Sequence, residues 1–335
     1  MAAVNPTPTR GGDIYIPPAE RSGNESIVYF TRDLSAAGLR KAYAKVNGHI
    51  SGKVAVKLHT GEKDGPNIIP RAWVADLMEH ELSGATIIET NTYYEGDRDT
   101  TEKHRATIAH NGWTFAPVDI MDEQGAAELP VLGGRWFDKM SVGQNLLDYH
   151  SLVALTHFKG HTMGGFGGSN KNIGIGCADA FVGKAMIHRS ADGAQWGITD
   201  EEFMERMTES TKATIDFFGA RATYVNVMRN MSVSCDCEGT AAQPVVTPDV
   251  GILASTDILA IDQASVDLVF AMTDDGLVGN RDLVERMKTR HGLRQLTYMH
   301  ELGMGNWNYI LIDLDNGGAR IGLVDAVSHV VPFEG

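Results

Sequence analysis

The stretch 157–188 combines many glycines with side chains that hold metals or carry cofactors. It reads HFKGHTMGGFGGSNKNIGIGCADAFVGKAMIH. Glycine lets a backbone approach a bound group closely and adopt positive φ angles. Histidine, cysteine and lysine ligate metals or form covalent bonds with cofactors. The reactive side chains of the stretch are His157, His161, Lys171, Cys177, Lys184 and His188. Their concentration predicts a metal or cofactor pocket built on a glycine-rich loop.

The glycines and the lysines after them are the residues expected to contact a cofactor. They are Gly164, Gly165, Gly167, Gly168, Lys171 and Lys184. The run GGFGGSNK lacks the G-x-x-x-x-G-K-[ST] spacing of phosphate-binding loops, and it does not match the G-x-G-x-x-G dinucleotide fingerprint. The loop therefore predicts a site without identifying what occupies it.

A second cluster of candidate ligands is the run SCDCEG, 234–239. Two cysteines so close in sequence can direct both thiolates at one ion if they lie in a loop, although a tight turn with incidental small residues is an equal alternative. Asp236 and Glu238 should raise the thiol pKa values and oppose thiolate formation, unless a cation compensates. The candidate metal ligands are Cys177, Cys235, Cys237, His161 and His188. Three cysteines with an open position suit an iron–sulfur cluster or zinc.

Two more polar segments follow predicted strands. In KLHTGEKDGPN, 57–67, the candidates for a substrate or anion loop are His59, Glu62, Lys63 and Asn67, and a solvated loop is the alternative. In TNTYYEGDRDTTEKHR, 90–105, Arg98 could hold a carboxylate with two parallel hydrogen bonds, and His104 could act as an acid or base. The alternative for the second segment is a helix start, with Asp99 as the N-cap and Glu102 at the third helical position.

The elements that would position these segments alternate between strand and helix. Strands are expected at 53–59, 85–90 and 151–158. A helix is expected after each of the first two strands, at 68–82 and at 99–111. This order is typical of a parallel sheet, whose ligands bind beyond the carboxyl ends of its strands. The three polar segments should therefore meet at one edge of the sheet. The expected fold is α/β, with a mostly parallel sheet and helices on both faces.

The rest of the chain continues the pattern. Further helices are expected at 34–46, after the capping candidate Asp33, and at 200–217, 280–289 and 291–302. Strands are expected at 222–229 and in DVGILAST, before a helix in ILAIDQASVDLVFAM, and a strand pair (NYILIDLD and ARIGLVD) ends the chain. We expect an irregular arm over 1–26, a main domain over 27–260 and a small C-terminal α/β subdomain over 261–335.

The bulk composition excludes several classes of partner. The chain has 335 residues and a formal net charge of -14, so neither nucleic acid nor an anionic membrane surface is an expected partner. No apolar run is long enough to span a bilayer, and the polar N-terminus does not match a signal peptide. Three cysteines are too few for a secreted disulfide framework. These features predict a cytoplasmic protein. The apolar stretch VSHVVPF could pack in a homo-oligomer or complete the core.

Several motifs together resemble domain-of-unknown-function family 362. They are THFKGHTMGGFGGSNKNIGIG, NMSVSCDC, VGILASTDILAIDQASVDLV and HGLRQLTYMHELGMGN, and the resemblance extends from about Lys53 to His300. Members are often labelled uncharacterised iron–sulfur-centre proteins, and many carry an inserted ferredoxin module after the GK..IH motif. This chain has RSADGAQWGITD at that point, without cysteine. A cluster implied by the resemblance would therefore have to use Cys177, Cys235 and Cys237.

The glycine-rich stretch is also similar to that of lactate racemase and its nickel-pincer relatives. Those proteins have a histidine, a G-[FY]-S-G-G-R-K stretch and a second histidine; the lysine carries the cofactor, and the histidines serve as metal ligand and base. GFGGSNK places Lys171 at the lysine, with His161 before it and His188 after it. The family's His-Arg-Pro motif has no counterpart near Arg98. The resemblance implies a lactate-racemase-like scaffold more strongly than a shared reaction.

Three functions follow from these features. The first is a metal- or iron–sulfur-dependent enzyme of redox or lyase type, acting on a small polar molecule at the sheet edge. The second is a racemase- or isomerase-like enzyme with a nickel-type organometallic cofactor on Lys171; it would move a proton or hydride on a small carboxylate held by Arg98. The third is a non-catalytic electron carrier or assembly partner that docks through its acidic surface.

Overall fold

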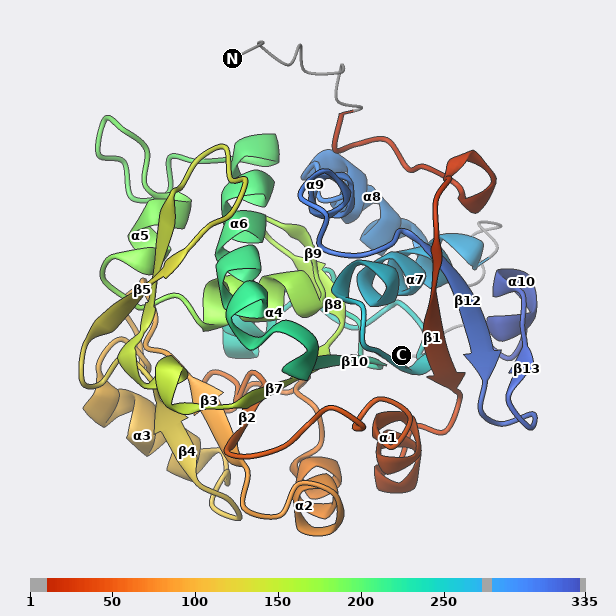
Figure 1. Cartoon of the computed structure of the whole chain (residues 1–335), viewed down its shortest axis with the longest axis horizontal. Helices are drawn as coiled ribbons and strands as arrows, with labels where there is room; N and C mark the ends of the chain where they lie inside the picture. The colour runs from red at the N-terminus through yellow and green to blue at the C-terminus, as the bar shows by residue number, and fades with distance from the viewer. Residues whose placement is uncertain (1–10, 273–278, 332–335) are drawn as a thin grey trace.

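The computed structural model describes residues 11–272 and 279–331, and a nine-stranded sheet forms the centre of this part of the chain (Figure 1). The strand order is β13-β12-β1-β11-β10-β7-β2-β3-β4. The strands are β1 (Glu25–Thr31), β2 (Val54–Lys57), β3 (Thr86–Glu89), β4 (Val118–Ile120), β7 (Ser151–His157), β10 (Ala222–Met228), β11 (Gly251–Ser255), β12 (Asn308–Asp313) and β13 (Ala319–Arg320).

The sheet is mostly parallel, which confirms the fold class expected from the alternation of strands and helices. Strands β10, β7, β2, β3 and β4 run parallel to their neighbours in this order. Strand β11 is antiparallel to both β10 and β1, while β12 is parallel to β1. Strands β7 and β10 are buried along their whole length, as a central strand covered on both faces should be.

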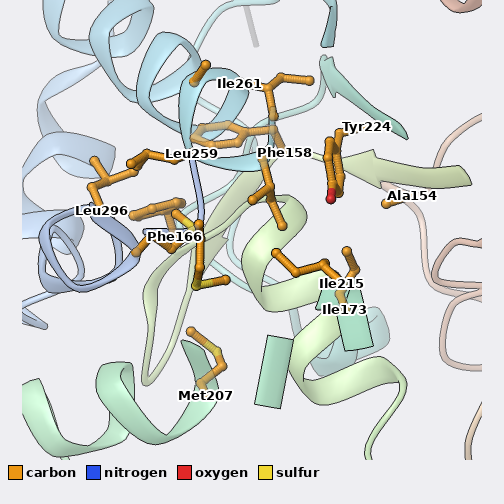
Figure 2. Packing of buried hydrophobic residues seen from close by; sticks show 14 of the residues in the cluster. Ala154, Phe158, Phe166, Ile173, Met207, Ile215, Tyr224, Leu259, Ile261 and Leu296 are labelled. Carbon is orange, nitrogen blue, oxygen red and sulfur yellow. The ribbon is translucent and has the colours of Figure 1, made fainter. Parts of the chain in front are cut away.

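Helices cover both faces of the sheet and create two separate cores. On one face, α1 (Ala36–Tyr43), α2 (Arg71–His80) and α3 (Thr101–His110) pack on Val56, Val153 and Leu155. On the other, α4 (Ser169–Gly176), α6 (Asp200–Phe218) and α7 (Ile258–Ala271) join a larger core with Ala55 and Ala154. Neighbouring strand residues thus belong to opposite cores, since side chains alternate along a strand. Figure 2 shows part of the larger core around Phe158 and Phe166.

Shorter elements complete the described structure. They are the hairpins β5 (Ala126–Pro130) with β6 (Lys139–Gly143) and β8 (Lys159–His161) with β9 (Gly165–Gly167), the helices α5 (Gly183–His188), α8 (Arg281–Thr289), α9 (Arg294–Glu301) and α10 (Leu323–Ala326), and the 3-10 turns η1 (Pro18–Glu20), η2 (Gln144–Asp148), η3 (Gly219–Arg221) and η4 (Asp236–Ala241). None of the described helices has the length and hydropathy that crossing a bilayer requires.

The structure corrects two predicted helix starts and one strand. Helix α1 is capped by Ser35, whose hydroxyl accepts from the Gly38 N–H, and not by Asp33. Helix α3 is capped by Thr100 in place of Asp99. In both helices the hydroxyl of the residue directly before the first turn reaches the free N–H groups. In ARIGLVD only residues 319–320 form a strand, and α10 follows.

The C-terminal residues belong to the same sheet as the main domain. The boundary expected near residue 260 falls within α7, and β12 pairs with β1 along six residues from each strand. Within the arm expected over 1–26, η1 and the start of β1 are ordered elements, while residues 1–10 lie outside the described part. The last residues of VSHVVPF also lie outside it.

The glycine-rich stretch is folded, rather than being an open loop. It forms the β8–β9 hairpin and then α4, whose N-cap is Gly168. Because glycine has no capping side chain, Asp262 from α7 accepts from the Ser169 and Asn170 N–H groups at 2.8 Å each. A Cβ at Gly168 would lie 2.5 Å from the Asp262 carboxylate, so this close approach requires glycine.

We predict that Asp262→Ala strongly destabilises the fold. The substitution leaves three buried donors unsatisfied, namely the N–H groups of Ser169 and Asn170 and the amide of Asn226, which also bonds Asp262. With about 1 kcal/mol or more for each donor, the free energy of unfolding should fall by about 3 kcal/mol or more. Urea unfolding measures the change. The surface variant Asp192→Ala should match the wild type, and equal midpoints for both variants would contradict the prediction.

Candidate functional site

A pocket of about 300 Å³ lies at the carboxyl ends of the parallel strands. Lys57 ends β2, Glu89 ends β3 and His157 ends β7, and all three side chains line it. Helices α4 and α5 contribute Lys171 and Lys184. The polar segments after the three strands therefore converge here, as the strand order predicts.

A group of residues that could hold a metal ion lies beside the pocket, and two of its members, His161 and Cys237, line it. Among the described residues, the donor atoms of His161, Cys235 and Cys237 all lie within 4.8 Å of one another. The local sequence explains how the cysteines are placed. The Cys235 sulfur accepts from the Cys237 N–H at 3.2 Å, and the Glu238 carboxylate accepts from the Cys235 N–H at 2.9 Å. This reciprocal capping box begins η4 and holds Cys235 at its N-cap.

Cys235 is placed where its thiolate is stabilised. Burial alone would raise its pKa, but the hydrogen bond with Cys237 and the charge of Lys171 hold that pKa well below its usual value. The Lys171 Nζ lies 3.5 Å from the Cys235 sulfur. The pKa of Cys237 is raised well above its usual value, because its thiol is hydrogen-bonded to Cys235 and is buried. The pair therefore holds one thiolate and one thiol.

The sequence predicts that Asp236 and Glu238 oppose thiolate formation unless a cation compensates, and in the structure each of these carboxylates has partners of its own. Asp236 lies 2.8 Å from His157 Nδ1 and 3.1 Å from Lys159 Nζ, so the Lys159 ammonium group compensates its charge. Burial would raise the pKa of Asp236, but these contacts hold it well below its usual value. Glu238 is engaged in the capping box. Lys171 is the compensating cation that the thiolate needs.

The orientation of His161 is fixed by the glycine hairpin. Its Nδ1 accepts from the Gly164 N–H at 2.7 Å, so a neutral ring carries its proton on Nε2. Burial lowers the pKa of His161, and the ring is therefore neutral. Nε2 is the nitrogen left for the interaction with the Cys235 sulfur. Gly164 thus sets which ring nitrogen meets the cysteines.

A buried ion-pair network centred on Glu89 also lines the pocket. Its carboxylate lies 2.9 Å from Lys57 Nζ and accepts from the Thr60 N–H at 2.8 Å. Burial would raise the Glu89 pKa, but Lys57, His59 and Arg98 hold it well below its usual value. The carboxylate is therefore ionised although it is almost completely buried.

Arg98 has an internal carboxylate as its partner. Its Nε and Nη2 donate to Glu62 Oε1 at 2.9 and 2.5 Å, and Nη2 also donates to Tyr94 at 3.0 Å. Its Nη1 lies 3.7 Å from Glu89. Two donors of Arg98 thus meet one oxygen of Glu62, and they hold the loop of Glu62 against that of Arg98.

Lys184 and His188 lie one turn apart on α5 and both face the pocket. The Lys184 Nζ donates to Thr90 Oγ1 at 2.7 Å and to the Asn91 carbonyl. Burial lowers its pKa to about 8. His188 Nδ1 donates to the Lys184 carbonyl at 2.7 Å, so in the neutral ring Nε2 carries no proton and its lone pair is free. Burial lowers the pKa of His188 to about 4.

Several predicted site residues lie away from the pocket surface. Cys177 is the C-cap of α4, fully buried in the larger core and outside the His161–Cys235–Cys237 group. Burial raises its pKa to about 12. Gly164, Gly165, Gly167, Gly168, Lys63, Asn67 and His104 do not line the pocket either. The glycines approach protein segments instead; Gly165, with φ of +73°, packs on Gly292.

The pocket also contains residues that the sequence motifs did not single out. Lys57, Glu89 and Lys159 form ion pairs within it, and Tyr93 and Trp196 add aromatic rings. Lys57 and Glu89 could have been found, because each ends a strand of the parallel sheet. Trp196 comes from an irregular segment after α5, where periodicity gives no signal.

One known protein family matches more than half of this chain. The model of the family described as Domain of unknown function (DUF362) matches residues 54–267. The chain belongs to the DUF362 family. No curated protein matches it. The matched residues run from β2 into α7 and include the residues that line the pocket.

Two solved structures are distantly similar to this DUF362 chain. The lactate racemase apoprotein from Thermoanaerobacterium thermosaccharolyticum is 10% identical, covers 90% of this chain and 85% of its own, and superposes with a TM-score of 0.40. A protein from Thermotoga maritima is 11% identical, with a TM-score of 0.35 over 57% of this chain. The match spans 49% of that second protein.

We predict that Lys171→Met raises the pKa of the Cys235 thiol. The substitution removes the cation at 3.5 Å while keeping a side chain of similar length. An ultraviolet pH titration of the thiolate should show its absorbance persisting to lower pH in the wild type than in the variant. Cys177 contributes little below its pKa of about 12. Lys103→Met, at an exposed lysine paired with Asp99, is the control. Superimposable titrations of Lys171→Met and wild type would refute the assignment.

Proposed function

We propose that this protein is a metal-dependent enzyme that acts on a small polar molecule in the pocket at the strand ends. The observation that supports the proposal most directly is the convergence of His161, Cys235 and Cys237 beside the pocket, with donor atoms within 4.8 Å of one another. An iron–sulfur centre, zinc or another transition metal that accepts thiolate and imidazole ligands is compatible with this donor set.

The residues present fit a metal by their chemistry. Cys235 is held as a thiolate, and Cys237 has one proton to release. His161 is neutral, and for Nε2 to ligate an ion its proton would move to Nδ1, which would give up the hydrogen bond from Gly164. Three protein ligands leave a coordination position for substrate, as in catalytic zinc sites. A bound metal would supply Lewis-acid polarisation of the substrate, or electron transfer if it is redox-active. Lys171, which lies beside Cys235, would then offset the negative charge of the thiolates.

The pocket also contains a base. His188 is neutral at pH 7 because burial lowers its pKa to about 4, and its Nε2 lone pair is available to accept a proton. Its ring is positioned by the Lys184 carbonyl and by Trp196, whose ring centroid lies 4.9 Å away. A proton taken from the substrate at Nε2 can return to either product or solvent. An electron carrier needs neither this base nor an enclosed pocket, and this difference favours an enzyme.

We expect metal binding to depend on Cys235 and Cys237 and not on Cys177. Protein purified anaerobically and analysed for metals should contain about one metal centre per chain, and Cys235→Ser or Cys237→Ser should remove most of it. Cys177→Ser is the matched control, because this thiol is buried elsewhere. The Co²⁺-loaded protein should show thiolate charge-transfer absorption that both site variants lose. Unchanged metal content in the Cys235→Ser, Cys237→Ser double variant would overturn the proposed centre.

A second candidate is an enzyme whose cofactor is attached to Lys171. Lys171 faces the pocket and lies beside both Cys235 and the interacting ring of His161. Its pKa is raised by the thiolate in spite of burial, so the free amine is protonated and attachment would need a separate maturation step. Intact mass of protein from its native host decides between the candidates. An added mass located on Lys171 supports this one, and active protein with unmodified Lys171 excludes it.

We predict that His188→Gln abolishes proton transfer while leaving the metal in place. Incubation with a panel of small organic acids in D₂O should identify one whose C–H exchanges with solvent, and the variant should lose about 100-fold or more of that rate. In the wild type the rate should fall as pH drops through about 4, where the base becomes protonated. His110→Gln, at a half-exposed histidine outside the pocket, is the control. Equal exchange rates for His188→Gln and wild type would exclude the role.

A further inference from the structure

The cations of the pocket differ in whether they have an anionic partner. Four of them do: Lys57 lies 2.9 Å from Glu89, Arg98 lies 2.5 Å from Glu62, Lys159 lies 3.1 Å from Asp236, and Lys171 lies 3.5 Å from the Cys235 sulfur. Lys184 is different. Among residues 11–272 and 279–331, no carboxylate lies within 4 Å of its Nζ.

The surroundings of Lys184 nevertheless hold its ammonium group in one place. Nζ donates to Thr90 Oγ1 and to the Asn91 carbonyl, which are neutral acceptors. The acidic residue with the largest effect on Lys184 is Asp122, whose carboxylate oxygens instead accept from the N–H groups of Asn91 and Ala180. An ammonium group has three N–H donors, so one remains. The side chain is 5% exposed and lines the pocket.

A buried cation without an anionic partner is expensive, and a bound anion would remove that cost. The remaining donor of Lys184 and its charge thus define a subsite for an oxyanion. Since His188 lies one turn further along α5, an anion held here places the neighbouring atoms of the ligand near the base.

The rest of the lining indicates what carries the oxyanion. Met163, Ile175, Tyr93 and Trp196 give the pocket apolar surface. The rings of Tyr93 and Trp196 meet edge to face at 5.3 Å, and Trp196 is 41% exposed, which places it at the pocket mouth. An inorganic anion would leave these walls without contacts. A volume of about 300 Å³ accommodates only a small organic ligand.

We propose that Lys184 binds the carboxylate of a small organic acid whose apolar part lies against Tyr93 and Trp196. The inference rests on the proposed function, because it names the substrate class of the same pocket. It also moves the role of carboxylate partner, expected from the sequence at Arg98, to Lys184. Arg98 is already held by Glu62.

The test compares ligands that differ in charge. Propionate, propionamide and inorganic phosphate are titrated calorimetrically into wild-type protein, Lys184→Met and Lys184→Arg. Propionate should bind the wild type, and Lys184→Met should weaken it by about tenfold or more, the effect of losing a hydrogen bond to a charged group. Propionamide should bind weakly and equally to wild type and Lys184→Met. Lys184→Arg should recover part of the propionate affinity. Lys139→Met, at an exposed lysine paired with Glu128, should behave as wild type.

Three outcomes would overturn the inference: no propionate binding to the wild type, equal propionate affinity in Lys184→Met, or phosphate binding more tightly than propionate through Lys184. If Lys184→Met does not fold, lysine footprinting of wild-type protein replaces it. Propionate should then protect Lys184, and not Lys139, from an amine-reactive reagent, and equal labelling of Lys184 with and without propionate would refute the subsite.

Metal content measured on the same samples separates the two proposals. If metal-free protein binds propionate through Lys184, the subsite stands and the metal centre does not. If metal-loaded protein binds no propionate, the metal centre stands and the subsite does not.

Discussion

The pocket depends on one electrostatic constraint, which is that charges removed from water must be compensated within the protein. Lysines, an arginine, carboxylates and a thiolate are all buried within a small volume. The desolvation of each would cost several kcal/mol without a partner. Glu89 compensates Lys57, and Lys171 compensates the Cys235 thiolate. The same contacts keep Glu89 and Cys235 ionised, while burial keeps His161 and His188 neutral.

The topology of the sheet explains why so many distant residues can meet. Strands β2, β3, β7 and β10 are parallel neighbours, so the segments that follow them leave the sheet at the same edge. The metal-ligand candidates come from two of these segments. His161 is in the hairpin after β7, and the cysteines are in η4 after β10. Thr162 and Glu238 join the two segments by a hydrogen bond of 2.6 Å.

The fold class and the location of the pocket can be predicted from the amino-acid sequence. The contacts between particular side chains in the pocket cannot. Alternating apolar runs are sufficient to predict parallel strands, and reactive residues after strand ends are sufficient to predict the edge at which they meet. Pair contacts are a different matter. Arg98 appears free in the sequence, but Glu62, which lies 36 positions away, is its partner. Cys177 resembles a ligand by residue type, but its helix directs it into the core. Such outcomes depend on tertiary distances, which local patterns do not encode.

The N-terminus of α4 has a consequence for how the site is built during synthesis. Its first turn, which carries Lys171, is held by Asp262 on α7, and its thiolate partner is Cys235. The ribosome makes His161 and Lys171 well before it makes these partners. Until α7 has been synthesised and packed, the first turn of α4 has no acceptor, and Lys171 has no counter-ion until Cys235 has been made and packed beside it. The group of His161, Cys235 and Cys237 is therefore a product of tertiary folding and not of any contiguous peptide.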